Sequence, residues 1–314
     1  MREGPAQGHE GQGEEVIRAR LSAAAAVLCA AAAAGCGLGP GEDSGEVELT
    51  ITRDYGASVL EQATESIDES DTVLRVLDRS ADLETRYGGG FVQSIDGVAG
   101  SQSGGRRTDW FFYVNGIESP IGSAQYDLSD GDRVWWDYRD WTAAMRVPAV
   151  VGSWPEPFAH GFEGERWDAD VRCLAPASVC GRVSVQISDA GAGRRDESGA
   201  DITVLVGTWK RVRSDPDADL LDEPPSESGV FATFTGERRP LLTLLNERGE
   251  PAGSLGRGGG LVAALRPDEG PPTWVVTGTD PTGVRAAADL LGDELGNHFA
   301  VATDGAGEIG VPVP

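Results

Sequence analysis

The fold is decided by the stretch Asp109–Trp141, DWFFYVNGIESPIGSAQYDLSDGDRVWWDYRDW. Its early residues, 110–114, are all aromatic or β-branched, which suits a pleated and half-buried strand. Asn115-Gly116 then supplies the two positive-φ positions that a type I′ turn requires. This combination predicts a tight β-hairpin at the start of the stretch.

The second half of the stretch reads as another strand. After a turn at 130–132, Val134, Trp136 and Tyr138 recur at every second position, which is the pattern of a strand with one buried face. Trp135 must then point to the opposite face. There it is either covered by a second domain or exposed as a platform for binding.

The residues upstream follow the order of a β-grasp fold. Residues 47–51 alternate as a first strand, and Val59–Ile67 can return as a second strand. Thr72–Ala81 carries apolar residues at helical spacing, which predicts a helix that covers the sheet. The segment Ser101–Thr108 is polar and is predicted to be a solvated loop.

Two motifs in this region resemble a known family. They are W-x-x-Y-V-N-G at Trp110–Gly116 and Y-x-L-x-x-G-D-x-V-x-W at Tyr126–Trp136. Both look like the transcobalamin-type C-terminal domain, a β-grasp module related to soluble ligand-binding β-grasp domains. The resemblance covers roughly Val47 to Trp141. It implies binding of a small ligand and suggests one of corrinoid type.

Glycines and tryptophans around the hairpin are candidates for the binding site. Gly88–Gly90 is either an ordinary turn or backbone that lets a ligand or another chain approach closely. Five of the eight tryptophans fall between 110 and 154, more than a small sheet core requires. The predicted ligand-binding residues are Gly89, Gly90, Phe91, Trp110, Tyr113, Asn115, Trp135 and Trp136.

The second part of the chain, 146–314, is predicted to be a mixed α/β domain, which makes the whole an α+β protein. It is similar to the C-terminal part of actinobacterial lipoproteins that carry the same β-grasp module. Ser153–Asp168 reads as a loop, and the acidic, proline-containing Ser214–Ser228 reads as an exposed loop. The predicted strands are Val147–Gly152, Asp170–Leu174, Ile202–Val206, Val230–Phe234, Leu241–Leu245, Leu261–Leu265, Trp274–Thr277 and Phe299–Ala302.

Two helices are predicted in this second domain. Ala177–Ala190 fits both strand and helix periodicity, and we take it as the helix of a βαβ unit because Ile202–Val206 then follows as the next strand. Asp280 can cap a helix in which Pro281 occupies the first turn.

The N-terminus carries a targeting segment. Arg18 and Arg20 precede an uncharged run, Leu21–Gly35, that has the length of a secretory h-region and is too short to span a bilayer comfortably. Ala33-Ala34-Gly35-Cys36 resembles a bacterial lipobox, which implies lipidation at Cys36. An ordinary signal peptide with a chance cysteine is the alternative.

These features divide the chain into four parts. We expect a lipoprotein signal peptide at 1–35, a flexible tether at 36–45, the transcobalamin-like domain at 46–145 and the mixed α/β domain at 146–314. Residues 1–15 are polar and acidic, unlike an n-region, so translation starts either at Met1 or at Val16.

Cys173 and Cys180 are predicted to form a disulfide. Removal of the signal segment and lipidation of Cys36 leave only these two thiols, in a compartment that permits oxidation. Two cysteines without a neighbouring histidine supply only half of a zinc shell. Burial as two separate free thiols is the remaining alternative.

Several functions are disfavoured by the sequence. A net charge of −25 provides no basic surface for nucleic acid or anionic lipid. Gly278–Gly283 has the glycine spacing of a phosphate loop but lacks its Lys-Ser/Thr. The acidic run from Asp215 lacks the glycine and glutamate of a calcium loop, and the histidines are isolated. We therefore expect no enzyme activity, no metal and no cofactor.

Two functional hypotheses follow. The first is a membrane-tethered, extracytoplasmic lipoprotein that binds a small ligand in the β-grasp domain or between the domains and delivers it to a membrane importer, in the manner of nutrient uptake. The second is a structural or protein–protein interaction module of the cell envelope that binds no small ligand. In both, contact with the membrane is made through the N-terminal lipid only.

Overall fold

The computed structural model describes residues 45–192, 202–236, 238–292 and 295–314, together with Met1. Residues 43–314 belong to one compact unit. Residues 2–35 of the predicted signal segment and 36–44 of the predicted tether, Cys36 included, lie outside the described residues, whereas residue 45, predicted as the end of the tether, is the first residue of a strand. Among the residues that are described, no helix is long and apolar enough to cross a membrane.

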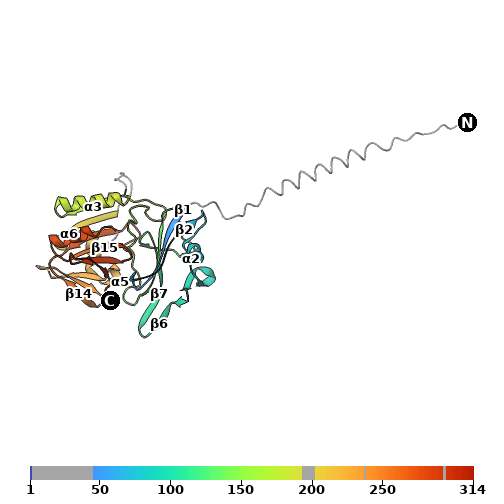
Figure 1. Ribbon diagram of the computed structural model, residues 1–314, viewed down its shortest axis with the longest axis horizontal. Helices are drawn as coiled ribbons and strands as arrows, with labels where there is room; N and C mark the ends of the chain where they lie inside the picture. The colour runs from blue at the N-terminus through green and yellow to red at the C-terminus, as the bar shows by residue number, and fades with distance from the viewer. Residues whose placement is uncertain (2–44, 193–201, 237, 293–294) are drawn as a thin grey trace. The chain divides into compact units, whose positions relative to one another are not determined.

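The first large sheet has the predicted β-grasp order. Helix α2 (Val73–Ser80) follows the first two strands and covers one face, on the outer side in Figure 1. The first and last long strands, β1 and β9, are parallel neighbours. The sheet order is β2 (Ser58–Ile67), β1 (Gly45–Arg53), β9 (Arg133–Asp140), β7 (Arg106–Val114) and β6 (Ser101–Ser103), and β8 (Ile117–Glu118) pairs with β7.

The predicted hairpin is confirmed. Asn115 and Gly116 have φ angles of 52° and 76°, and Val114 pairs with Ile117 across the two-residue turn. The loop predicted at Ser101–Thr108 is instead a second hairpin, formed by β6 and β7. Arg106 near its tip is held by the carboxylate of Asp140, with 3.0 Å between Nε and Oδ2.

A small antiparallel sheet lies beside the first one. It consists of β3 (Leu83–Arg86), β4 (Phe91–Ile95) and β5 (Val98–Ala99). The glycine run forms part of a short 3-10 turn, η1 (Tyr87–Gly89), between β3 and β4. This turn leaves the Tyr87 side chain 88% exposed and Phe91 40% exposed.

The second large sheet begins as the predicted βαβ unit. Strands β10 (Ala169–Leu174), β11 (Ile202–Thr208) and β16 (Thr273–Gly278) are parallel, and α3 (Ala177–Asp189) connects the first two. Helix α6 (Pro281–Asp289) follows β16 and is capped by Asp280, as predicted. The sheet continues through β15 (Gly260–Leu265), β17 (Ala300–Thr303) and β18 (Glu308–Val311).

Shorter elements fill the chain between β11 and β15. A three-stranded sheet contains β12 (Ala232–Thr235), β13 (Leu241–Leu245) and β14 (Pro251–Leu255). The helical turns α4 (Trp209–Val212), η2 (Pro216–Asp222) and α5 (Pro225–Ser228) precede it. Ser214–Ser228 is therefore not the exposed loop that was predicted, because Ala218 and Leu221 are fully buried. The prediction also missed β14 and β18, and it began β12 two residues too early.

The strand predicted at Val147–Gly152 is wrong. The segment makes only an isolated bridge, between Ala149 and Ile117. Its backbone bonds to both halves of the molecule instead: Val150 N donates to Gly116 O at 2.8 Å, and Val151 N donates to Phe299 O at 3.1 Å. Its apolar residues are buried as a connector between two sheets rather than as a member of either.

The predicted disulfide is confirmed. Cys173, near the end of β10, is bonded to Cys180 in α3, with 5.7 Å between the two Cα atoms. A bridge over so short a loop is expected to stabilise the fold by about 2 to 3 kcal/mol in the chain-entropy treatment. Such bridges persist in oxidising compartments outside the cytoplasm.

The two large sheets are joined by an aromatic cluster. Trp135 is 2% exposed and lies against Phe299, with 5.2 Å between ring centroids. Tyr113 and Tyr55 also contact Phe299, at 5.5 and 5.0 Å. Burial raises the pKa of Tyr55 to about 12. Trp135 is thus covered by the second half of the chain, and an exposed platform is excluded.

Two charged side chains are fully buried beside this cluster. Asp137 accepts hydrogen bonds from Thr52 Oγ1 at 2.6 Å and from the backbone N–H groups of Tyr55 and Gly56 at 3.0 Å each. Arg139 donates to the carbonyl oxygens of Ala144 and Met145. Desolvation by burial raises the pKa of Asp137. Hydrogen bonds of this kind are what make buried charge tolerable.

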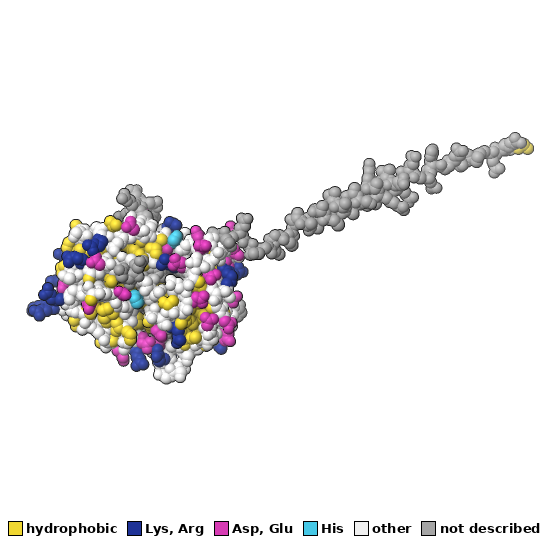
Figure 2. Space-filling view, viewed as in Figure 1, with side chains coloured by type: hydrophobic (Ala, Val, Ile, Leu, Met, Phe, Trp, Pro, Cys, Tyr) yellow, Lys and Arg dark blue, Asp and Glu magenta, His cyan; other side chains and the backbone are white. Residues whose placement is uncertain are grey.

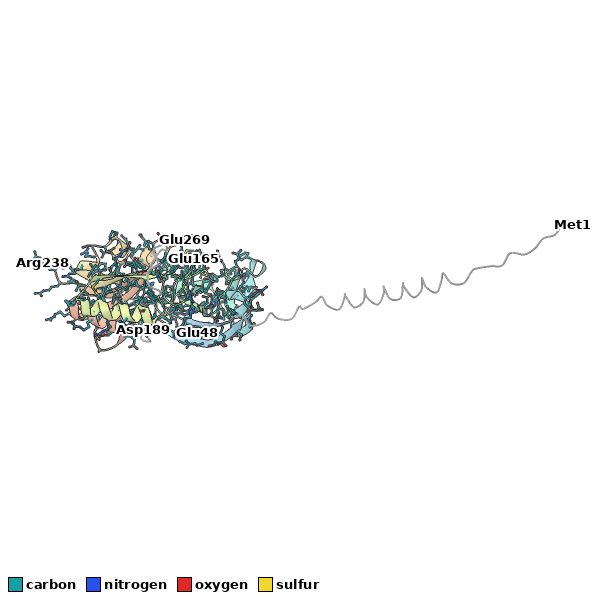
Figure 3. The ribbon with its side chains drawn as sticks, turned by 90° about the horizontal axis from the view of Figure 1, so that it is seen from above. Met1, Glu48, Glu165, Asp189, Arg238 and Glu269 are labelled. Carbon is teal, nitrogen blue, oxygen red and sulfur yellow. A yellow bond between two sulfur atoms is a disulfide. The ribbon has the colours of Figure 1, made fainter. Side chains whose placement is uncertain are left out.

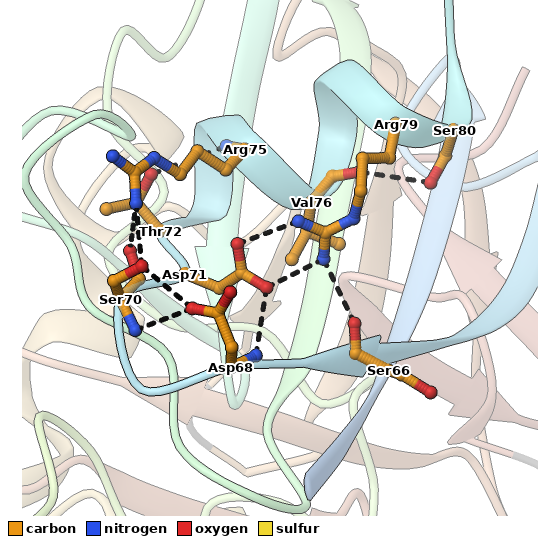
Figure 4. Close-up of polar contacts among 9 residues, drawn as sticks. All are labelled: Ser66, Asp68, Ser70, Asp71, Thr72, Arg75, Val76, Arg79 and Ser80. Carbon is orange, nitrogen blue, oxygen red and sulfur yellow. Dashed lines mark hydrogen bonds and ion pairs between the residues drawn. The ribbon is translucent and has the colours of Figure 1, made fainter. Parts of the chain in front are cut away.

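A polar network fixes the start of α2 (Figure 4). Thr72 caps the helix by accepting from Arg75 N. The buried carboxylate of Asp71 accepts from both Nη atoms of Arg79, at 2.7 and 2.8 Å, and from Asp68 N at 3.1 Å. The Arg79 hydrogen bonds hold the pKa of Asp71 below its usual value.

Asp71→Asn is expected to lower the free energy of unfolding by about 1 kcal/mol near pH 7, a value discounted because Arg79 is partly exposed. An acid whose pKa is lowered by folding stabilises the fold above its unfolded pKa, about 3.9, and that contribution disappears as the pH falls through the folded value. Urea unfolding of both proteins near pH 7 and near pH 3 should therefore show the difference shrinking in acid. An undiminished difference near pH 3 would contradict this role for the Asp71 charge.

Candidate functional site

A cavity of about 530 Å³ lies between the first large sheet and the part of the chain that carries the second. One wall is the face of the first sheet that points away from α2, at the β1 and β2 edge. The other wall contains the C-terminal end of α3 and the residues Leu291, Gly292, Gly296 and Asn297, and the 152–155 segment closes one side. We call this space the inter-sheet cavity.

Polar residues of β1 and β9 form the first wall. Glu48 and Thr50 alternate with the buried Val47 and Leu49, so they point to the side opposite α2. Arg133 lies next to Glu48 in the parallel register, with 3.0 Å between Nη2 and Oε2. Its other terminal nitrogen donates to Trp154 O. Arg133 is therefore held in place from two sides.

Helix α3 contributes the second wall. Gln186 Nε2 donates to Leu291 O at 2.8 Å, whereas its Oε1 is buried and has no hydrogen-bond partner among the described residues. Asp189 lies one turn further along α3. Figure 3 shows Asp189 and Glu48 near each other where α3 meets β1, and both line the cavity.

The cavity combines size, polarity and aromatic surface. Its volume falls within the roughly 300–1,000 Å³ of typical small-molecule sites. Trp135 and Trp154 supply apolar surface, and the polar lining side chains are Glu48, Thr50, Gln62, Arg133, Ser153, Gln186, Asp189 and Asn297. Such a lining can bind a small organic molecule with several hydrogen-bonding groups.

A second, smaller space of about 230 Å³ lies on the opposite face of the first sheet. Its side walls and floor include Phe91, Trp110, Phe112 and Trp136, so we call it the aromatic groove. The rings of Phe112 and Trp136 lie 5.0 Å apart, and Trp136 Nε1 is buried without a partner among the described residues. The exposed rings of Tyr87 and Phe91 stand near one end, 6.3 Å apart.

The structure separates the predicted ligand-binding residues. The aromatic groove contains Gly90, Phe91, Trp110 and Trp136, and Gly89 lies in the adjoining 3-10 turn. Trp135 lines the inter-sheet cavity instead. The eight residues therefore do not form a single site.

Tyr113 and Asn115 are placed where they support the fold. Tyr113 is fully buried in the aromatic cluster. Asn115 donates from Nδ2 to Asp132 Oδ1 at 2.8 Å and to Gly161 O at 2.9 Å, and its Oδ1 accepts from Arg133 N. Its side chain thus ties the hairpin to two other turns and is not available to a ligand.

Most residues of the inter-sheet cavity carry no signal in the sequence. Glu48 and Asn297 lie about 250 residues apart in the chain, and no spacing rule connects them. One signal was available: the alternation of 47–51 places Glu48 and Thr50 together on the face opposite the core. Which segment covers that face could not be read from the sequence.

Comparisons with known proteins match parts of the chain. Residues 70–140 match the family described as a domain of unknown function (DUF4430). A protein described as metal-binding from Ruminococcus gnavus is 19% identical over 31% of this chain and 97% of its own, with a TM-score of 0.24. Haptocorrin in complex with Cbi is 13% identical over 33% of this chain and 27% of its own, also with a TM-score of 0.24. No curated protein matches.

The fold and cavities define an α+β protein with a β-grasp-like sheet and a ligand-sized cavity between two sheets. The part of it that matches DUF4430 comprises α2, the small sheet, and the strands from β6 to β9.

Proposed function

We propose that this protein binds a small polar organic molecule in the inter-sheet cavity, outside the cytoplasm. The observation that carries the proposal is the cavity of about 530 Å³, which is lined by Trp135, Trp154 and eight polar side chains. The Cys173–Cys180 disulfide supports an extracytoplasmic location.

The finer parts of the proposal rest on the sequence. Lipidation at Cys36 would tether the protein to the outer side of the membrane, where it could pass its ligand to an importer. A corrinoid-like ligand follows from the transcobalamin resemblance. We propose a binding role without catalysis, so that the ligand leaves unchanged.

Native mass spectrometry of the protein purified from its own host tests this proposal. We expect a bound small molecule, on a chain that begins at diacylated Cys36. Thr50→Trp, which fills the cavity from β1, should reduce the bound fraction about tenfold or more, since a misfit in a packed pocket costs over 1 kcal/mol. Thr64→Trp is the matched control. Thr64, in the neighbouring strand β2, is exposed on the same face of the sheet as Thr50 but does not line the cavity.

A third variant, Phe91→Ser, separates the two spaces. It should retain the ligand, because Phe91 belongs to the aromatic groove. Loss of the ligand in Phe91→Ser together with retention in Thr50→Trp would move the site to the groove. If no preparation carries a small molecule, and none of the polar compounds or cobalamins added in solution binds, the envelope-interaction hypothesis replaces this one.

A further inference from the structure

A further cavity, of about 690 Å³, lies at the carboxyl ends of the parallel strands of the second sheet. Strand β10 ends at Leu174 and β11 ends at Thr208, and both residues line this space. Thr279, directly after β16, lines it as well. It has no lining residue in common with the inter-sheet cavity.

The connections around β11 explain why a crevice opens here. The chain leaves β11 through α4, whose Trp209 and Val212 pack on one face of the sheet. It leaves β10 and β16 through α3 and α6, which pack on the other face. Neighbouring parallel strands whose connections go to opposite faces leave a crevice beyond their carboxyl ends, and ligands of open α/β sheets bind in such crevices.

Three cations line this cavity: Lys210, Arg211 and Arg238. None of them makes an ion pair with another described residue. Lys210 is the single lysine in a chain whose net charge is −25. Figure 2 shows basic side chains at the end of the molecule that carries α3 and α6, and many acidic side chains around β1, β2 and α2. Arg238 projects at that basic end in Figure 3.

The remaining polar groups of the cavity compensate this charge only in part, and Arg211 Nη1 donates to Leu174 O at 3.0 Å. Its single lining carboxylate among the described residues, Asp280, accepts from the N–H groups of Thr282, Gly283 and Gly258. The N-cap of α3 is Pro176, which lines the cavity and gives the helix no side-chain cap. The free N–H groups at the start of a helix add positive potential that favours an anion.

We propose that this cavity binds a small molecule through a phosphate or diphosphate group. The planar guanidinium of arginine matches phosphate oxygens in pairs, and lysine supplies a compact positive charge beside it. The cavity exceeds the size of an inorganic ion, and Leu174, Pro240 and Val284 offer apolar walls for the rest of the ligand. This binding site is separate from the inter-sheet cavity and does not depend on the function proposed for it.

Pyrophosphate is the probe for this proposal. The full chain is titrated with it by calorimetry at constant ionic strength, because exposed charges are screened by salt. A second readout is amine acetylation followed by peptide mass analysis, in which bound pyrophosphate should protect Lys210, the single lysine. Lys210→Gln and Arg238→Gln should each weaken pyrophosphate binding about tenfold, the usual effect of losing one charge-assisted hydrogen bond.

Arg248→Gln is the matched control. Arg248 is also exposed and does not line the cavity, so the same loss of charge there should leave the affinity unchanged. Unaltered binding in Lys210→Gln and Arg238→Gln, or equal weakening in Arg248→Gln, would overturn the proposal. Tighter binding of succinate than of pyrophosphate would overturn the assignment to phosphate. Lys210→Gln and Arg238→Gln change exposed side chains and retain the buried contacts of the fold. Their urea midpoints should therefore match that of the parent protein.

Discussion

Trp135→Ala is expected to lower the free energy of unfolding by about 3 to 5 kcal/mol, the usual cost of truncating a buried tryptophan. The ring is 2% exposed, contacts Tyr113 and Phe299, and donates from Nε1 to Thr52 Oγ1 at 2.7 Å. Truncation removes these contacts and leaves the Thr52 hydroxyl without this donor. Urea unfolding followed by far-UV circular dichroism measures the effect.

Phe91→Ala is the control for this substitution. Phe91 is also aromatic but lies in the small sheet and is 40% exposed, so its truncation should cost less than about 1 kcal/mol. A Trp135→Ala protein that unfolds at the midpoint of the parent and has lost only ligand binding would contradict the packing role of Trp135.

Gly116→Val is expected to destabilise the protein by about 3 kcal/mol, through strain at positive φ and a clash with backbone. Gly116 has a φ of +76°, and a Cβ atom there would lie 2.8 Å from the carbonyl oxygen of Val150. The Gly116 carbonyl also accepts from Val150 N at 2.8 Å, so any shift of the turn disturbs the connector between the sheets.

Gly97→Val is the control that separates the backbone strain at positive φ from the clash with the Val150 carbonyl. Gly97 has the same φ of +76°, in an Asp-Gly turn, and a Cβ atom there would meet nothing within 4 Å. Its substitution should therefore cost only the strain, about 1 to 2 kcal/mol. Equal shifts of the two urea midpoints would show that the Val150 carbonyl moves away at no cost.

Local chemistry was sufficient to predict several elements. The Asn115-Gly116 turn, the Asp280 cap and the Cys173–Cys180 bridge each depend on residues close together in the chain, and each is present. Alternation also placed Trp135 on the face opposite Trp136. In these cases the residue type and its neighbours determine the conformation.

The parts that failed depend on distant partners. Val147–Gly152 has the composition of a strand, but its hydrogen bonds go to a turn and to Phe299, about 150 residues away. Ser214–Ser228 has acidic residues that indicate a loop, yet Ala218 and Leu221 are buried under a face that other strands create. The inter-sheet cavity likewise takes its walls from segments far apart in the chain.

The contact between Trp135 and Phe299 has a consequence for the time course of biogenesis. A chain is made from its N-terminal end, so the first sheet is complete before Phe299 and the strand after it are available. Until that last segment arrives, the aromatic face with Tyr55, Tyr113 and Trp135 remains exposed to solvent and can bind other chains. Completion of the fold therefore waits for the C-terminal segment, and this interval is when the protein is most vulnerable to aggregation and proteolysis.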